Sequence, residues 1–247
     1  MIDTETLIRL RSMRLSGMAD CFEAVAANPD LTRLSACEVV KMAVGWEWER
    51  RQDSKLARLR KRAHLPQPNA DIHDIQPLPG RRIDTDMITR LGVGTYLAHH
   101  QDVILQGPTG TGKTFIACAL ANKACQQYHN VFYITAPELF DQLSAGERTG
   151  YKAQVLDGLV KVELLIVDDW FLSTPTKEQA RNLHVLVDRR HRRASTIYCT
   201  QLGPEKWHDR IEEKILADAI IDRITTNAHT TILDCSVSLR RHFNDIN

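Results

Sequence analysis

The stretch GPTGTGKT at Gly107–Thr114 decides the fold of this chain. It has the spacing G-x-x-x-x-G-K-T, follows the apolar run DVILQG at 102–107 and precedes the helical stretch FIACALANKAC at 115–125. Glycines let successive backbone N–H groups converge on a phosphate, and the helix that follows adds the positive end of its dipole. We therefore interpret the stretch as a phosphate-binding loop between a strand and a helix, not as a flexible turn that happens to contain a lysine.

This loop predicts a site for ATP and Mg²⁺. Lys113 is expected to bridge the β- and γ-phosphates, and the hydroxyl of Thr114 is expected to ligate the metal ion. Backbone N–H groups of the loop are expected to hold further phosphate oxygens. The expected nucleotide-binding residues are Gly107, Pro108, Thr109, Gly110, Thr111, Gly112, Lys113 and Thr114.

Two adjacent acids, Asp168 and Asp169, follow four apolar residues in LLIVDDW at 164–170. A buried strand of a parallel sheet delivers the residues at its carboxyl end to a ligand crevice. We expect Asp168 to hold the magnesium ion through water, and Asp169 to orient or deprotonate the attacking water. Taken alone, the pair fits equally well a strand that ends in two solvated aspartates. The phosphate-binding loop upstream favours the catalytic interpretation.

The composition is that of an ordinary globular protein with a core, with 43% hydrophobic and 26% charged residues among 247. The formal net charge is +1, so a contact with nucleic acid has to come from a local patch. The N-terminus lacks the apolar core of a signal peptide and no apolar run is long enough to span a bilayer, so we expect a cytoplasmic protein without membrane contact. The six cysteines form no zinc-type pattern and are expected to be reduced.

Three regions of the chain differ in composition and residue pattern. Residues 1–66 indicate a small all-α N-terminal domain for DNA binding and assembly, and the proline-rich residues 67–83 indicate an extended linker. In residues 84–247, short apolar runs alternate with helical segments, which is typical of an α/β fold whose parallel sheet is covered on both faces. The expected strands are 102–107, 131–135, 162–169, 195–200 and 230–235.

A basic segment, RRQDSKLARLRKR at 50–62, has seven basic residues and one acidic residue. Helical spacing places a basic stripe on one face and apolar residues on another, where they are available for packing. The stripe consists of Arg51, Lys55, Arg58 and Arg62, and the apolar residues are Trp48, Leu56, Leu59 and Ala63. Cations without base-reading amides suit the phosphate backbone of duplex DNA, so we expect largely sequence-independent binding. The alternative is a solvated helix face.

Two further features of the sequence have weaker interpretations. The cluster DRRHRR at 188–193 is a second candidate for DNA contact, or it complements the C-terminus of a helix. Trp46 and Trp48 could stack on bases, although packing in a core or an interface is the expected role.

The chain resembles the AAA+ ATPases of the IstB/DnaC group, and most closely the IstB-type helper ATPases of insertion-sequence transposons. The matching stretches are QGPTGTGKT, LLIVDDW, STIYCTQLGPEKWHD, LADAIIDRI and SLRR, within residues 84–247, and the basic EWERRQDSKLARLRKRAHLP. The resemblance implies sheet order 5-1-4-3-2. It also implies an ATPase that forms a homo-oligomer through ATP-bridged interfaces, binds duplex DNA and helps a transposase to select its target. Only 24 residues follow Arg223, too few for the full helical lid of most AAA+ proteins.

The resemblance also assigns roles outside the loop. Thr200 or Gln201 becomes sensor 1, and the spacing does not choose between them. Arg223 matches the arginine finger that one subunit donates to the nucleotide of its neighbour, for which the forked guanidinium is well suited. Its alternative role is an ion pair with Asp222 at a helix end. Most AAA+ proteins have glutamate where this chain has Asp169, so slow hydrolysis is expected. Arg240 and Arg241 are further candidates to approach the nucleotide.

Two other functions remain open at this point. One is a DnaC-like replicative helicase loader, which shares the ATPase parts but uses its N-terminal region on a helicase. The other is a nucleotide-switched scaffold that does not hydrolyse ATP. The basic stripe favours a DNA partner, and the intact Lys113, Asp168 and Asp169 favour hydrolysis.

Overall fold

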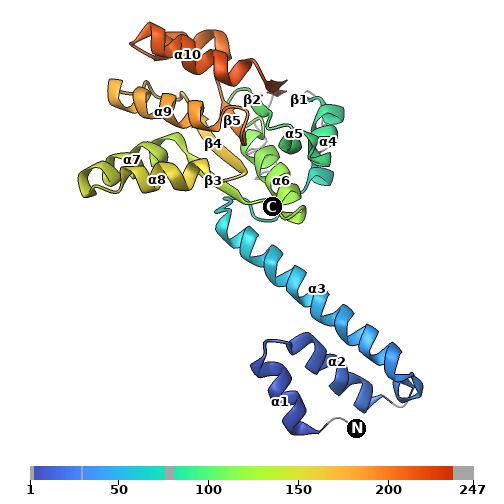
Figure 1. Cartoon of the computed structure of the whole chain (residues 1–247). Coiled ribbons are helices and arrows are strands. Elements are labelled where there is room, and N and C mark those ends of the chain that lie inside the picture. The colour runs from blue at the N-terminus through green and yellow to red at the C-terminus, as the bar shows by residue number, and fades with distance from the viewer. Residues whose placement is uncertain (1–2, 29, 76–80, 236–247) are drawn as a thin grey trace, which may run out of the picture. The chain divides into compact units, whose positions relative to one another are not determined.

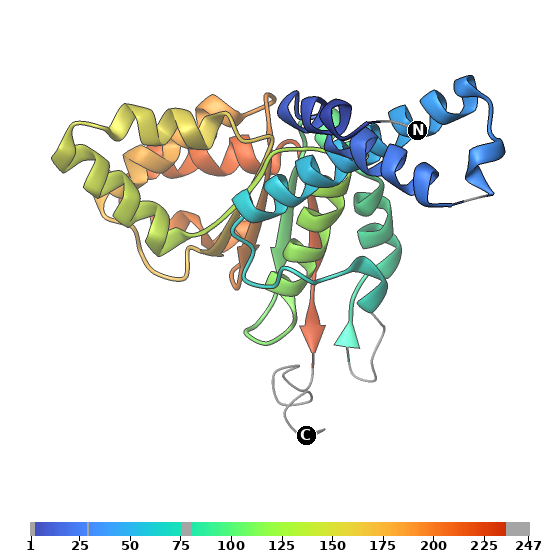
Figure 2. The ribbon, with the colours of Figure 1, turned by 90° about the horizontal axis from the view of Figure 1, so that it is seen from below.

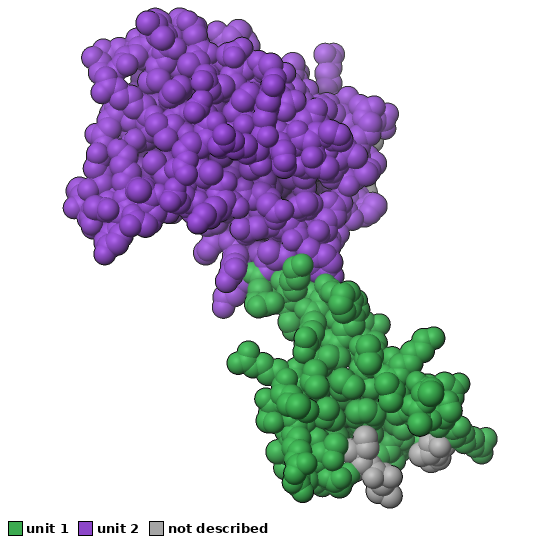
Figure 3. Space-filling view, viewed as in Figure 1, with its two compact units in different colours: residues 1–58 green, residues 59–247 purple. Residues whose placement is uncertain are grey.

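The structure is a computed structural model that describes residues 3–28, 30–75 and 81–235 (Figure 1). The chain divides into two compact units, Met1–Arg58 and Leu59–Asn247 (Figure 3). Within the described residues, the N-terminal unit contains helices and turns only, whereas the C-terminal unit contains all the strands. Helix α3 (Ala36–Arg62) is continuous across the division.

The N-terminal unit is held together by close contact between helices. It consists of α1 (Thr4–Ser12), α2 (Ser16–Ala27), a 3-10 turn (Leu31–Arg33) and most of α3. The side chain of Asp3 caps α1 by accepting the N–H of Thr6 at 2.7 Å. A Cβ on Gly17 would lie 2.7 Å from the Cα of Glu47, so only glycine allows α2 to approach α3 this closely.

Glu47 connects the same two helices through hydrogen bonds. Its buried carboxylate accepts the N–H of Gly17 at 2.8 Å and the Nε–H of Arg51 at 2.6 Å. Burial alone would raise the pKa of Glu47. The hydrogen bonds from Arg51 and Gly17 and the charge of Arg51 outweigh that effect and lower the pKa. The carboxylate of Glu47 therefore stays charged, and Arg51 is part of the structure of this unit.

A five-stranded parallel sheet forms the centre of the C-terminal unit (Figures 1 and 2). Its strands are β2 (Asp102–Gln106), β3 (Val131–Thr135), β4 (Leu164–Trp170), β5 (Ser195–Thr200) and β6 (Ala228–Ile232). Their order is β3-β4-β5-β2-β6, and every neighbouring pair is parallel. Counted along the chain and read from β6, this is the order 5-1-4-3-2, which confirms the expected topology.

The last expected strand, 230–235, is two strands in the structure. After β6 the chain forms the short strand β7 (Asp234–Cys235), which pairs antiparallel with β1 (Arg81–Arg82) in a separate two-stranded sheet. Helix α10 (Lys214–Thr225) leads into β6. The expectation about a lid after the last strand concerns residues 236–247, which lie outside the described residues.

Helices cover both faces of the sheet (Figures 1 and 2). On one side lie α4 (Thr85–Val93), α5 (Thr95–Ala98) and α6 (Lys113–Gln126). On the other side lie α7 (Ala136–Thr149), α8 (Lys152–Val160), α9 (Lys177–Arg190) and α10. Capping boxes fix where α7 and α9 begin, because Thr135 and Thr176 each exchange hydrogen bonds with the residue three positions later.

The segment expected as a linker, 67–83, contacts the ATPase core where it is described. Ala70 and Ile75 are buried, and the side-chain amide of Asn122 in α6 donates to the carbonyls of Pro68 at 3.0 Å and Ala70 at 2.8 Å. The N–H of Tyr133, on the outer strand β3, donates to the carbonyl of Ala63 at 2.9 Å. Because these apolar and hydrogen-bonding groups engage the core, the compact C-terminal unit begins at Leu59 and not after residue 66.

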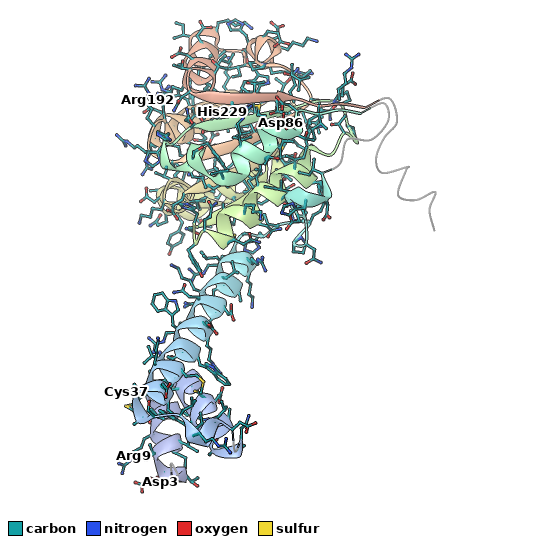
Figure 4. The ribbon with its side chains drawn as sticks, turned by 90° about the vertical axis from the view of Figure 1, so that its right-hand side faces the viewer. Asp3, Arg9, Cys37, Asp86, Arg192 and His229 are labelled. Carbon is teal, nitrogen blue, oxygen red and sulfur yellow. The ribbon has the colours of Figure 1, made fainter. Side chains whose placement is uncertain are left out.

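Half of the arginines in the basic cluster at 188–193 have structural roles. Arg190 is buried and donates to the carbonyls of Leu159, Val162 and Ser195, and Arg189 pairs with Asp157 at 2.7 Å. Arg192, which is labelled in Figure 4, and Arg193 are the exposed arginines of the cluster. Arg189 and Arg190 therefore connect α9 to α8 and β5, whereas Arg192 and Arg193 remain the exposed candidates for contact with a phosphate backbone. Among the described helices, none combines the length and apolar composition that crossing a bilayer requires.

Candidate nucleotide site

The glycines of the loop between β2 and α6 are each required by geometry. A Cβ on Gly107 would lie 2.3 Å from the carbonyl oxygen of Leu233, so the backbone approach excludes any other residue. Gly110 and Gly112 have φ angles of +85° and +91°, in the left-handed region that favours glycine. The loop thus has the compact, glycine-dependent shape that the sequence predicts for a phosphate cradle.

Lys113 lies against the loop's own backbone. Its Nζ donates to the carbonyl of Gly107 at 2.7 Å and to that of Pro108 at 2.9 Å. The Thr111 hydroxyl donates to the same Pro108 carbonyl at 2.9 Å. Helix α6 begins at Lys113, and Gly112 before it provides no side-chain cap for the N–H groups of the first turn. The structure therefore brings a lysine ammonium group and a helix N-terminus together at one loop.

The carboxylate of Asp168 receives three hydrogen bonds from three different elements. Oδ2 accepts the hydroxyl of Thr114 in α6 at 2.7 Å and the hydroxyl of Tyr133 in β3 at 2.8 Å. Oδ1 accepts the N–H of Asp169 at 2.8 Å. The two residues that the sequence predicts as metal ligands are thus in direct contact. Tyr133 was not predicted, because a tyrosine inside an expected strand has no signature of such a role.

The donor set at this point suits a magnesium ion. Mg²⁺ prefers hard oxygen ligands and usually keeps several waters, so one hydroxyl and one carboxylate beside a phosphate loop are sufficient protein ligands. Thr114 and Asp168 provide such oxygens at the junction of β4 and α6.

Asp169 lies in a different environment from its neighbour. Asp168 is 5% exposed, whereas Asp169 is an exposed residue with a left-handed φ of +55°. The pairing of β4 with β5 is irregular between Val167 and Trp170, so the regular alternation of the strand is interrupted at the two acids. One acid is consequently buried and hydrogen-bonded, and the other is available to solvent.

An aromatic cluster lies behind the acids. The rings of Trp170, Phe171, Tyr198 and Trp207 pack with centroid separations of 4.6 to 6.4 Å. The indole N–H of Trp207 donates to the carbonyl of Leu202 at 2.9 Å. The cluster therefore joins the end of β4 to the loop that follows β5.

The two sensor 1 candidates differ in what surrounds them. Thr200 is buried, and its hydroxyl donates to the carbonyl of Leu202 at 2.9 Å and accepts the N–H of Leu202 at 3.1 Å. Gln201 is exposed. The Thr200 hydroxyl is thus engaged within its own turn.

Arg223 forms an ion pair with a residue that was not expected. Its Nε donates to Oδ1 of Asp188 in α9 at 2.8 Å, and its other guanidinium nitrogen NH1 donates to the carbonyl of Ala219 at 3.0 Å. Asp222, the alternative partner suggested by the sequence, instead accepts the hydroxyl of Thr226 at 3.1 Å. Arg240 and Arg241 lie outside the described residues.

The basic stripe of α3 is partly engaged. Arg51 is paired with Glu47, and the Nε of Arg58 donates to the carbonyl of Ser54 at 3.3 Å. Ala63 is buried, and Leu56 and Leu59 are half-buried, as their expected packing requires.

The two tryptophans of α3 depart from expectation. Trp48 is 65% exposed and Trp46 is 39% exposed, so neither is in the core of the described N-terminal unit. Of the two expected roles, packing in a core is therefore wrong for this unit, and packing in an interface stays a prediction. Trp48 has no covering element there, since α2 contacts α3 through Gly17 and Glu47.

Comparisons with known proteins agree with this site. A family model described as "IstB-like ATP binding protein" matches residues 8–243. An insertion-sequence ATP-binding protein of Sinorhizobium fredii, y4pL, is 38% identical over 247 residues, which cover 98% of each chain. The ATP-binding protein of insertion sequence IS1162 from Pseudomonas fluorescens is 35% identical over 202 residues, 82% of this chain and 87% of that one.

Among solved structures, a DnaC helicase loader matches with a TM-score of 0.58 at 15% identity, over 67% of this chain and 97% of that chain. A likeness at this level of identity concerns the fold. It agrees with the observed strand order and with the P-loop fold that the loop at Gly107–Thr114 predicts.

Proposed function

The chain belongs to the family of IstB-like ATP-binding proteins, and on that premise we propose that it is a DNA-binding AAA+ ATPase that assists a transposase in selecting its target. The observation that carries the proposal is the contact between Thr114 and Asp168 beside the glycine loop, at 2.7 Å. Relatives that match over nearly the whole chain are named as insertion-sequence ATP-binding proteins, which supports the link to transposition. The protein works in the cytoplasm, where its described cysteines remain free.

In this proposal, the residues of the loop bind the triphosphate. Lys113 exchanges the carbonyls of Gly107 and Pro108 for β- and γ-phosphate oxygens, and the first-turn N–H groups of α6 face the same anion. Thr114 and Asp168 hold Mg²⁺, which when bound neutralises charge on the phosphates. Asp169, exposed beside the buried Asp168, orients the attacking water.

Two further residues complete the proposed site. Gln201 is the better candidate for sensor 1, because the hydroxyl of Thr200 is already engaged by Leu202. Arg223 acts on the nucleotide of a neighbouring subunit in a homo-oligomer, for which it has to exchange Asp188 for phosphate. The ion pair with Asp188 holds the guanidinium group when no neighbour is bound.

For duplex DNA, the proposed contacts are the members of the stripe other than Arg51. Lys55, Arg58 and Arg62 lie on one face of α3 and are exposed. Arg51 supports the N-terminal unit through Glu47. These cations bind phosphates without reading bases, which suits a protein that must act at many target sequences.

A helicase loader is the second candidate function. One observation favours it: α3 also exposes Val40, Val44 and Trp48 at helical spacing, an apolar surface that suits a protein partner better than a phosphate backbone. A replicative helicase that is retained by the wild-type protein but not by Trp48→Ala would support the loader function.

Two variants test the ATPase proposal. Lys113→Ala should abolish ATP binding, because it removes the lysine ammonium that the proposal places on the β- and γ-phosphates. Asp169→Asn should bind ATP nearly as the wild type does but hydrolyse it far more slowly. The asparagine amide oxygen can still accept a hydrogen bond from water, but the carboxylate that acts as the base is lost. Nucleotide affinity and phosphate release, measured with and without duplex DNA, separate the two roles. Equal loss of binding and turnover in Asp169→Asn would contradict the role given to Asp169.

A further inference from the structure

We propose that Tyr133 is a positioning residue of the ATPase site, and that its hydroxyl holds the Asp168 carboxylate in the orientation that binds magnesium. The inference rests on the proposed function of Asp168 and Thr114. Tyr133 itself is assigned no contact with the nucleotide.

The geometry around the carboxylate supports this role. Tyr133 lies on β3, the strand next to β4, two residues before Thr135, which is in register with Asp168. This register carries the tyrosine ring alongside the end of β4, where its hydroxyl reaches Oδ2 of Asp168 at 2.8 Å. The hydroxyl of Thr114 reaches the same oxygen at 2.7 Å.

The backbone of Tyr133 is also fixed. Its N–H donates to the carbonyl of Ala63 at 2.9 Å, and the ring of its neighbour Phe132 packs edge-on against His64 with a centroid separation of 5.5 Å. The strand segment is therefore bonded on its outer side as well as to β4 on its inner side. A tyrosine held in this way presents its hydroxyl at a defined position.

The three donors to Asp168 differ in what happens when nucleotide binds. The Thr114 hydroxyl is itself a proposed metal ligand, so its lone pair has to turn toward the ion. The Asp169 N–H holds Oδ1 only. The Tyr133 hydroxyl also donates to Oδ2 and is not itself a proposed metal ligand, so it can keep that oxygen in place as the metal arrives. Groups that orient a metal ligand in this way typically change metal affinity by 10–100-fold when they are removed.

The experiment is a magnesium titration of nucleotide binding to the full-length protein. The affinity for ADP and for a non-hydrolysable ATP analogue is measured at increasing Mg²⁺ for the wild type, Tyr133→Phe and Tyr151→Phe. Tyr151 is 61% exposed and precedes α8, so its variant removes one hydroxyl away from the carboxylate. Tyr133→Phe should require about tenfold more Mg²⁺ to reach half of the magnesium-dependent increase in nucleotide affinity. Its affinity for nucleotide without metal should equal that of the wild type, which also shows that it folds.

The outcomes separate this inference from the function beneath it. If Tyr133→Phe and the wild type show the same magnesium dependence, the positioning role is wrong although the ATPase proposal stands. If the wild type binds nucleotide without any response to Mg²⁺, the proposed metal role of Asp168 fails and the inference fails with it. In an Asp168→Asn background, Tyr133→Phe should no longer shift the magnesium midpoint, because the hydroxyl acts through the carboxylate.

Discussion

At the scale of single residues, the phosphate loop leaves little freedom in its sequence. Gly107 is fixed by the approach of Leu233, whereas Gly110 and Gly112 are fixed by their own backbone angles. The first constraint connects the loop to the strand pair β1 and β7, because the N–H of Leu233 also donates to the carbonyl of Gln106 at 2.7 Å. A substitution at Gly107 therefore disturbs both the cradle and the chain that crosses beside it.

Gly107→Ala should destabilise the protein and weaken nucleotide binding together. The added Cβ would lie 2.3 Å from a backbone oxygen, and overpacking of this kind costs about 1–3 kcal/mol. Gly158→Ala is a matched control, because Gly158 lies in α8 with nothing within 4 Å of an added Cβ. That control should raise stability by about 0.5–1 kcal/mol. Urea unfolding and ATP affinity measure both effects. Wild-type stability in Gly107→Ala would contradict the steric argument.

The sequence predicted the site residues that belong to a recognisable local pattern along the chain. Lys113 and Thr114 follow from the loop pattern, and Asp168 follows from its place at the end of an apolar run. Tyr133 and Asp188 could not be found in this way. Their roles depend on hydrogen bonds to residues 35 positions along the chain in each case, which only the folded register creates.

At the scale of elements, the residue pattern predicted the parallel sheet but not every strand boundary. The alternation of apolar runs with helical segments indicated a parallel sheet, and the resemblance supplied its order. The sequence did not predict that the last expected strand is divided in two. β6 and β7 are separated by one residue and belong to different sheets. The proline-rich segment 67–83 was predicted as an extended linker, and its described part contacts the core. Its prolines gave no sign that Ala70 and Ile75 are buried, or that Asn122 donates to two of its carbonyls.

Helix α3 provides the prediction at this scale. Replacing Lys55, Arg58 and Arg62 with alanine should weaken DNA binding at all sequences and leave ATP affinity unchanged. If each meets one phosphate, the slope of log affinity against log salt should flatten by about 2.7, from roughly 0.9 per contact. Titrations of duplex DNA at several salt concentrations measure the slope. An unchanged slope would show that the stripe is a solvated helix face.

Two controls make this test specific. Replacing Arg148, Lys161 and Lys206 with alanine removes the same charge from exposed positions elsewhere, so it separates a local contact from the effect of net charge. Arg51→Ala should act differently from the other members of the stripe. It leaves the buried carboxylate of Glu47 without its cation and should destabilise the N-terminal unit by about 1 kcal/mol or more.

At the scale of the whole molecule, the likeness to relatives extends over both units. The relative from Sinorhizobium fredii matches 98% of the chain, whereas the DnaC helicase loader matches 67% of it. The fold of the ATPase unit is thus common to several kinds of protein, and the combination with this N-terminal unit is shared with insertion-sequence relatives. In the proposed function, ATP hydrolysis depends on assembly, because Arg223 on α10 would act on the nucleotide of another subunit.

Mixing two inactive variants tests that assembly. Arg223→Ala lacks the finger and Asp169→Asn lacks the water-orienting acid, so each alone should hydrolyse ATP poorly. In an equal mixture that assembles at random, about a quarter of the interfaces should combine an intact Arg223 with an intact Asp169 and recover activity accordingly. Phosphate release measured across mixing ratios should therefore pass through a maximum.

The control mixture joins Lys113→Ala with Asp169→Asn. Both changes lie on the nucleotide-binding side of an interface. Both variants therefore still donate Arg223, but each lacks one residue that its own nucleotide site requires. No subunit in this mixture has both Lys113 and Asp169, so no interface contains a complete nucleotide site. This mixture should therefore stay inactive at every ratio. Recovery in both mixtures, or in neither while light scattering still shows oligomers, would contradict an Arg223 that acts across the subunit interface. Recovery in the first mixture alone requires that the finger and the acid come from different chains.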